Sequence, residues 1–201
     1  MTRFGLLVRL EAQHGKDQEV DAFLRSAVPL VQAEGGTAAW FAVRFGRYEY
    51  GIFDAFATEA DRDAHLNGAV AAALMQNAAT LLAAAPSIQK VDILADKLPA
   101  GAHDAITKGL LLTFEAKHGH EQQVEQFLRD AKALVEAEPK TVFWFALAFG
   151  GGKYGIFDVF PDNGGRFTHL TGHVPRELAK HALSLLGSVP ETHLPDVIAE
   201  K

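Results

Sequence analysis

The chain has 201 residues, carries a formal net charge of −6 and contains no cysteine. The negative charge argues against a nucleic-acid partner, which needs a concentrated basic surface, and the lack of cysteine excludes disulfides, thiolate metal sites and a cysteine nucleophile. No apolar run approaches the roughly 20 residues of a membrane span, and the first residues hold too short an apolar stretch for a secretory signal. We therefore expect a cytoplasmic protein with no membrane partner.

The chain opens with a predicted strand and a predicted helix. Residues 4–10 form an apolar run rich in β-formers, which is typical of a strand. Residues 16–34 place apolar side chains three and four positions apart, which predicts an amphipathic helix. Pro29 lies inside this segment and is expected to kink the helix or to end its regular part early. Gly35 and Gly36 break it.

A predicted hairpin, a second helix and a last strand follow. Residues 37–45 and residues 50–56 are β-rich runs joined by the turn sequence GRYE. Residues 58–84 are rich in alanine and predict a helix with Thr58 as its N-cap. Residues 88–94 predict a fourth strand. The order β-α-β-β-α-β is that of a ferredoxin-like unit.

The second half of the sequence repeats the first. YGIFDAF at residues 50–56 returns as YGIFDVF at residues 154–160, and GLLVRLEAQHG, TAAWFAVRFG and HLNGAV return as GLLLTFEAKHG, TVFWFALAFG and HLTGHV at the same interval. Close to half of the aligned positions are identical, and the period is domain-sized, too long for a solenoid unit. We predict a first repeat over residues 1–96, a linker over 97–107 and a second repeat over 108–201.

The repeat also predicts how the sheets are covered. A ferredoxin-like sheet carries both helices on one face and leaves the other face apolar and bare. A second sheet can cover that face, and the second repeat supplies one. The expected fold class is therefore α+β, with two ferredoxin-like repeats packed sheet to sheet as a dimeric α+β barrel made within one chain. Whether the tandem chain forms a further homodimer is left open.

These motifs resemble the antibiotic biosynthesis monooxygenase-type (ABM-like) domain of the dimeric α+β barrel superfamily. The matching pieces are W-F-A from Trp40, Y-G-I-F-D from Tyr50 and H-L-x-G from His65. The second copy carries them from Trp144 and Tyr154, and again in the H-L-x-G at residues 169–172. The resemblance covers nearly the whole chain.

The resemblance implies a cofactor-independent monooxygenase, which lets a small aromatic or quinol-like substrate react with oxygen in a pocket between sheet and helices. It implies no cofactor and no metal. The haem-degrading branch is a poorer match, since the first strand reads Gly-Leu-Leu-Val where that branch has asparagine. The implied catalytic residues are His65, His169, Asp54 and Asp158. The implied substrate-binding residues are Trp40, Tyr50, Asn67, Arg44, Trp144 and Tyr154.

The two histidines are suited to general-base work, because imidazole titrates near neutral pH. We expect His65 and His169 each to open a helix, beside the sheet. The competing interpretation is structural, with each ring capping its helix or bonding to a backbone carbonyl. The spacing of His169 and His173 would suit a metal pair on one helix, but only one repeat has it and no third ligand is evident.

The two aspartates lie inside apolar strands, where an unpaired carboxylate would cost several kcal/mol or take up a proton. Each therefore needs a partner, water or a cavity. One interpretation places Asp54 and Asp158 in a pocket, and the other pairs them with Arg62 and Arg166 as structural ion pairs. The tryptophans have a similar pair of interpretations, as sheet packing or as pocket walls.

Differences between the repeats bear on function. Arg44 is replaced by Ala148 and Asn67 by Thr171, so any two pockets would not be equivalent, and one half could act while the other completes the barrel. GGGK at residues 150–153 lacks the spacing of a phosphate loop and predicts a hairpin turn. Two alternatives to an enzyme remain at this stage. One is a non-catalytic small-molecule-binding or stress-response protein, and the other is a structural assembly unit.

Overall fold

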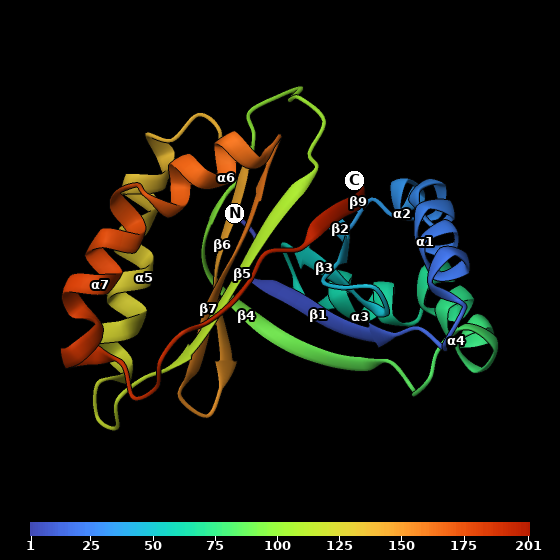
Figure 1. Cartoon of the computed structure of the whole chain (residues 1–201), viewed down its shortest axis with the longest axis horizontal. Coiled ribbons are helices and arrows are strands. Elements are labelled where there is room, and N and C mark those ends of the chain that lie inside the picture. Colours follow the sequence, from blue (N-terminus) through green and yellow to red (C-terminus); the bar gives the residue numbers. More distant parts are fainter. The chain divides into compact units, whose positions relative to one another are not determined.

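The computed structural model describes residues 1–201, apart from the side chains of Ala182 and Leu183. The chain divides into two compact units, shown in Figure 1. Unit 1 comprises Met1–Val91 and Pro195–Lys201, and unit 2 comprises Asp92–Leu194. Each unit is an antiparallel sheet with helices, so the predicted α+β class is confirmed.

In unit 1 the first residues of β4 (Ser87–Lys97) lie next to β1, and an antiparallel ladder continues in the order β1–β3–β2–β9. Its strands are β1 (Phe4–Glu11), β2 (Thr37–Arg44), β3 (Glu49–Phe56) and β9 (Asp196–Glu200). The three strands predicted for this part of the chain are therefore present, shifted by a residue at most at each end. The strand β9, which completes this ladder beside β2, comes from the far end of the second repeat.

The two helices predicted for the first repeat are each divided in two. The first becomes α1 (Asp17–Ser26) and α2 (Val28–Ala33), with Pro29 in the first turn of α2, where its missing N–H costs nothing. The second becomes α3 (Glu59–Leu66) and α4 (Ala69–Leu81). Thr58 caps α3 as predicted, since its hydroxyl accepts a hydrogen bond from the Asp61 N–H.

Unit 2 contains a five-stranded antiparallel sheet in the order β4–β6–β7–β5–β8. Its strands are β4 (Ser87–Lys97), β5 (Lys108–Glu115), β6 (Phe143–Gly150), β7 (Lys153–Phe160) and β8 (Glu191–His193). The GGGK segment is the hairpin turn between β6 and β7, as predicted. Gly151 and Gly152 adopt φ values of 61° and 79°, which glycine accepts without strain.

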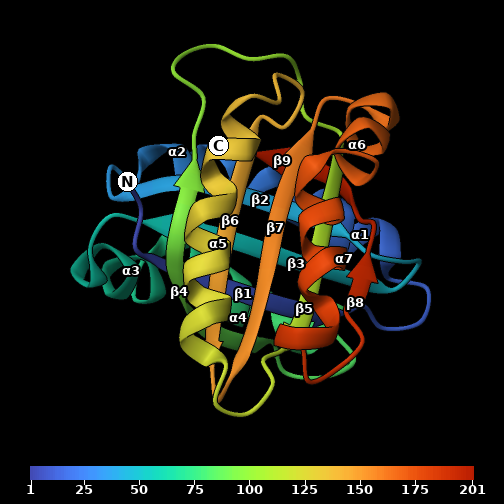
Figure 2. The same cartoon turned by 90° about the vertical axis from the view of Figure 1, so that its left-hand side faces the viewer.

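Three helices belong to unit 2, namely α5 (Glu121–Glu136), α6 (Asn163–Leu170) and α7 (His173–Leu185). Figure 2 shows α5 and α7 running across one face of this sheet. The helix α5 is continuous where the first repeat has α1 and α2, because Ala133 stands in place of Pro29. None of the described helices is long and apolar enough to cross a membrane.

The last strand of each repeat passes from one unit into the other. The strand β4 begins in unit 1, and from Asp92 onward it pairs with β6 of unit 2. In the second repeat, β8 pairs with β5, and after a break at Pro195 the strand β9 pairs with β2 of unit 1. The changeover falls at equivalent positions in the two repeats, so each unit is completed by a strand from the other repeat.

The helix-facing side of each sheet carries the aspartates. In unit 1, Tyr50 and Ile52 pack in one buried cluster with Val20 and Leu24 of α1. Side chains alternate along a strand, so Asp54 points to the same side. The equivalent residues of β7 lie in the helix-packed cluster of unit 2. The acids of the two repeated heptapeptides therefore face the helices.

Candidate functional site

The centre of the site in unit 2 is Asp158, which is completely buried in the middle of β7. Its neighbours across the sheet are Leu110 on β5 and Trp144 on β6. Because paired residues of adjacent strands share a face, the carboxylate lies between an aliphatic and an indole side chain. Neither of its carboxylate oxygens has a hydrogen-bond partner among the described residues.

His169 lies above this carboxylate, in the last turn of α6. The prediction that this histidine opens a helix was wrong. The helix begins instead at the N-cap Asp162, whose Oδ1 accepts a hydrogen bond of 2.7 Å from the Gly165 N–H. It ends at Thr171, and His173 starts α7. His169 and His173 therefore lie on different helices, so the metal-pair spacing is not realised on one helix.

The imidazole of His169 lies between two carboxylates. Its Nε2 is 3.1 Å from Asp158 Oδ2, and its Nδ1 is 2.6 Å from Glu138 Oε2. Thr141 donates its hydroxyl proton to the same Glu138 oxygen over 2.7 Å. Both ring nitrogens face carboxylates, so the doubly protonated ring forms an ion pair with each of them.

Burial and neighbouring charges shift the pKa values of His169, Asp158 and Glu138 in opposite directions. Burial alone would lower the pKa of His169, but the Asp158 and Glu138 carboxylates outweigh it and raise that pKa to about 10. Burial raises the pKa of Asp158 above its usual range, although the charge of His169 opposes this effect. The pKa of Glu138 is lowered, because hydrogen bonds from His169 and Thr141 overcome its burial. The two carboxylates therefore favour the charged form of His169 at neutral pH.

Unit 1 contains the same chain of three side chains. His65 Nδ1 is 2.5 Å from Glu34 Oε2, and His65 Nε2 is 3.7 Å from Asp54 Oδ2. Thr37 donates to Glu34 Oε2 over 2.9 Å. Burial raises the pKa of Asp54 to about 7, against the opposing charge of His65. We call these residues the Glu–His–Asp chains of unit 1 and unit 2.

The two arginines considered as partners of the aspartates bond elsewhere. Arg62 pairs with Glu59 at 2.8 Å and lies over the Phe4 ring. Arg166 donates to the Gly109 carbonyl and to the Asn163 side chain. The structural ion-pair interpretation therefore named the wrong partner, since the residue that reaches each aspartate is a histidine one turn further along the same helix.

The remaining candidates lie at different distances from this centre. Trp40 and Trp144 are buried directly beside the aspartates, and each indole N–H lacks a partner among the described residues. Tyr50 and Tyr154 share the same sheet face, but their hydroxyls bond to Asp17 on α1 and to Glu125 on α5. Arg44 bonds to the Gly46 carbonyl at the end of β2, and Asn67 is exposed at the end of α3.

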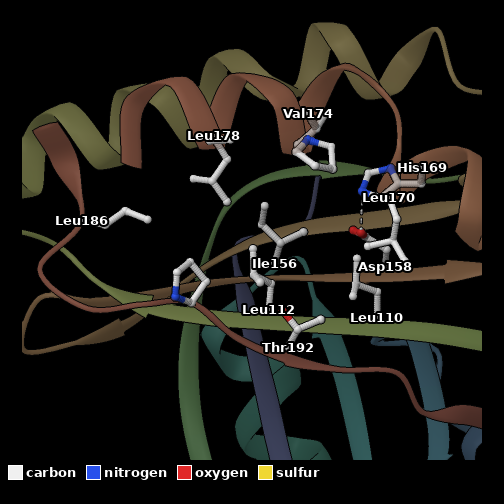
Figure 3. Close-up of a pocket in the computed structure, with 13 residues that line it drawn as sticks. Leu110, Leu112, Ile156, Asp158, His169, Leu170, Val174, Leu178, Leu186 and Thr192 are labelled. Atoms are coloured by element: carbon white, nitrogen blue, oxygen red, sulfur yellow. Dashed lines mark ion pairs between the residues drawn. The ribbon is translucent and has the colours of Figure 1, made fainter. Parts of the chain in front are cut away.

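A cavity of about 330 Å³ opens onto the Glu–His–Asp chain of unit 2 (Figure 3). It lies between the strands β5, β7 and β8 and the helices α6 and α7. Asp158 and His169 form one end of it, and Thr192 supplies a hydroxyl. The other lining residues are apolar, namely Leu110, Leu112, Ile156, Leu170, Val174, Pro175, Leu178, Ala179, Leu186 and Pro190.

A cavity of similar size in unit 1, about 320 Å³, has a different position. It touches Glu34 and His65, beside Gly36 and Gly68, and Asp54 does not line it. The buried carboxylate of unit 1 is therefore not reached from this cavity. The repeats are unequal, as the sequence differences between them predict.

Glu34 and Glu138 are the functional candidates that the sequence analysis missed. Each is a conspicuous match between the repeats, because VQAE and VEAE both end in this glutamate. Each follows the last turn of a helix and precedes the turn into the next strand. A shared acid at a helix end suggests capping or solvent exposure, and only the folded chain shows that it meets a histidine thirty-one residues later.

No protein-family model matches the sequence, and no curated protein matches it significantly. Solved structures do match. A candidate monooxygenase from Fusobacterium nucleatum subsp. nucleatum superposes with a TM-score of 0.86 at 11% identity, over 100% of this chain and 94% of that chain. A ferredoxin-fold protein of Listeria monocytogenes related to antibiotic biosynthesis monooxygenases has a TM-score of 0.58 at 8% identity, over 98% and 95%.

A protein of unknown function from Nitrosomonas europaea is 60% identical over 50% of this chain and 98% of its own, with a TM-score of 0.49. No activity is known for that protein. The two likenesses at low identity establish the fold over essentially the whole length of the chain. The chain is thus a tandem of two ferredoxin-like repeats with the fold of the antibiotic biosynthesis monooxygenase-like proteins.

Proposed function

We propose that unit 2 carries the active site of a cofactor-independent monooxygenase that acts on a small aromatic or quinol-like substrate. The observation that carries this proposal is the buried Asp158–His169 pair at one end of an apolar cavity of about 330 Å³. Such a cavity is large enough for a small ring system. The fold likeness to candidate monooxygenases supports the same reaction class.

The pair would generate the electron-rich anion that reacts with oxygen. The Oδ1 atom of Asp158 has no partner among the described residues, so it is free to accept a proton from a substrate O–H or activated C–H. A carboxyl group with a pKa raised by burial is a stronger base than an exposed one. The apolar lining keeps water from competing for the anion.

The overall chemistry balances without a cofactor. For an activated methylene between two aryl rings, one molecule of dioxygen converts the methylene group to a carbonyl group and gives one molecule of water. Both C–H bonds of the methylene break, one oxygen atom enters the substrate as the carbonyl oxygen, and the other leaves with the two hydrogens as water. The substrate supplies all the electrons that reduce oxygen, so the protein has to supply only proton transfer, binding and a dry site.

The role proposed for His169 differs from the base expected at the sequence level. A ring held between two carboxylates keeps its proton at neutral pH, so it cannot accept one from the substrate. We assign it the role of a fixed cation that stabilises the Asp158 carboxylate and the substrate anion beside it. Glu138 holds that cation in place through its 2.6 Å contact with Nδ1.

Oxygen uptake with a panel of hydroquinones and anthrones tests the proposal. We expect turnover that falls by at least about 10²-fold in Asp158→Asn and His169→Ala, because each removes one partner of the pair. Asp54→Asn and His65→Ala are the matched controls in unit 1, where the cavity does not reach the aspartate, and should retain most of the activity. Absence of turnover with every substrate would overturn the proposal.

A second experiment uses the chain as its own control. Ala179 lines the cavity of unit 2, and the equivalent residue of the first repeat is Met75. Ala179→Met should fill the cavity and cut turnover by about 10²-fold, since misplacing a substrate by an ångström costs that much. Met75→Ala, in the exposed position on α4, should leave turnover unchanged. Equal effects of the two variants would contradict the assignment to unit 2.

The alternative is a non-catalytic small-molecule-binding protein of the same fold. The cavity lining favours it in one respect, because outside the Asp158–His169 pair only Thr192 offers a polar group to orient a substrate. A binding protein would retain an apolar ligand without consuming oxygen. Ligand binding by calorimetry that survives in Asp158→Asn, together with no oxygen uptake, would support this alternative.

A further inference from the structure

We propose that Lys97 and Lys201 are positioning residues for the two Glu–His–Asp chains. Lys97 fixes the chain of unit 2, and Lys201 fixes the chain of unit 1. Lys97 directly follows the predicted first repeat and is the last residue of β4, the final strand of that repeat, yet it lies in unit 2. Lys201 follows β9 and comes from the second repeat, yet it lies in unit 1. The two lysines occupy equivalent positions in the repeated sequence.

The contacts of Lys97 converge on the glutamate of unit 2. Its ammonium donates to the Val135 carbonyl over 2.9 Å and to the Glu138 carbonyl over 2.6 Å. The Val135 carbonyl lies in the last turn of α5, where it also accepts the Glu138 N–H over 2.9 Å and where the helix dipole favours a cation. Glu138 is the residue whose side chain holds His169.

Lys201 repeats this arrangement in unit 1. Its ammonium donates to the Val31 carbonyl over 2.8 Å and to the Glu34 carbonyl. Val31 lies in the last turn of α2, and Glu34 holds His65. The helices differ in their regularity, since α2 is a short helix after a break and α5 is continuous, but the lysine finds the same two carbonyls in both units. Both repeats therefore share these lysine contacts, whether the preceding helix is broken, as before α2, or continuous, as in α5.

The hydrogen bonds from each lysine ammonium hold the position of the glutamate. Charge-assisted hydrogen bonds are about twice as strong as neutral ones, and each lysine makes two to the segment that carries the glutamate. Both lysines are partly buried, and burial is the main cause that lowers their pKa values. Without the ammonium, the segment from the helix end to Thr141 loses these two hydrogen bonds and keeps the backbone bonds to the same carbonyls. Glu138 would then no longer be held at 2.6 Å from the imidazole.

The test is a crossed pair of substitutions in the full chain, followed by nitrogen-15 NMR of the histidine rings. In Lys97→Met we expect the ring resonances of His169 to move and its pKa, about 10 in the parent, to fall, while the His65 resonances stay in place. In Lys201→Met we expect the His65 resonances to move and those of His169 to stay. Lys97→Arg, which keeps a charged donor, should restore most of the His169 signal.

An unchanged His169 in folded Lys97→Met would overturn the proposal, as would equal movement of both histidines in both variants. If Lys97→Met does not fold, Lys97→Gln keeps an uncharged N–H donor group and should give a smaller shift confined to His169. The proposal rests on the proposed function only for its catalytic consequence, a loss of oxygen uptake in Lys97→Met that exceeds the loss in Lys201→Met. The NMR result stands by itself, so failure of the two ideas can be told apart.

Discussion

At the scale of single residues, the buried aspartates link stability to pH. Asp54 is fully buried, and its pKa lies at about 7 compared with an ordinary value of 3.8. The folded chain therefore holds this proton up to about pH 7, whereas the unfolded chain releases it near pH 4. The stabilisation that comes from the bound proton is present at low pH and is lost as the pH rises toward 7.

Asp54→Asn should remove this dependence. Between pH 5 and pH 8 we expect the parent protein to lose about 2–3 kcal/mol of unfolding free energy through Asp54 alone, and the variant to lose that much less. Urea unfolding at the two pH values measures both losses. Parallel behaviour of parent and variant would show that Asp54 stays ionised in the folded chain.

A pH–rate profile tests the roles in unit 2. Turnover should rise with pH as Asp158 ionises, above the ordinary carboxyl range because burial raises its pKa. It should fall again near pH 10, where His169 loses its proton. The measurement is kcat/KM for oxygen uptake across the pH range. If neutral His169 were the base, the rate would continue to rise through pH 10.

Sequence inspection identified the two aspartates and the two histidines because both repeats carry them in the same motifs. It did not identify their contact. The spacing suggested arginine partners from the same helix as His65, and a helix of 3.6 residues per turn brings Arg62 and His65 to neighbouring faces. Which of them reaches the strand depends on the rotation of α3 against the sheet, and no local pattern fixes that rotation.

At the scale of elements, the repeats provide a natural comparison of proline and alanine at one helix position. Ala133 lies inside α5, where proline would remove a backbone hydrogen bond and clash with the preceding turn. Ala133→Pro should cost about 3 kcal/mol of unfolding free energy. Pro29→Ala should cost little, since Pro29 occupies the first turn of α2. Thermal or urea unfolding of both variants gives the comparison, and equal costs would contradict it.

Strands and turns were easier to predict than helix ends. Apolar runs predict β1 to β3 to within one residue at each end, whereas the predicted fourth strand, residues 88–94, stops three residues short of the end of β4. The division of the second helix was missed because the sequence from Thr58 onward is rich in helix formers throughout. Gly68 begins a new helix there, with extended backbone angles. A side chain at this glycine would meet the Ala64 carbonyl and the Glu34 carboxylate.

At the scale of the molecule, the exchanged strands make the repeats interdependent. A fragment of residues 1–96 would contain β1 to β3 but would lack β9, which pairs with β2. It would also contain β4 from Asp92 onward without its partner β6. We expect the fragment to form a homodimer in which each β4 takes the place of β9 in the other copy. Sedimentation analysis should give twice the fragment mass, and a folded monomer would contradict the expectation.

The repeat itself was evident from the sequence, but the exchange of strands was not. The last strand of each repeat has the same apolar pattern whichever sheet it joins, so periodicity cannot distinguish the two pairings. The break at Pro195 was the available signal, because proline cannot donate to a ladder, and it marks where β8 has ended and pairing with β2 begins. Lys97 and Lys201 lie at the ends of the exchanged strands. Their contacts could not be predicted, because the sequence does not show which sheet those strands join.

The exchange also sets the order in which the units can be finished during synthesis. Unit 2 is a continuous segment, Asp92–Leu194, whereas unit 1 needs residues from Pro195 onward. At typical ribosome speeds the intervening segment takes roughly 5 to 20 s to make. For that time the β2 edge of the half made first is unpaired and open to other strands. The half that is translated first is thus completed last, and the nascent chain is most exposed to misassembly in that interval.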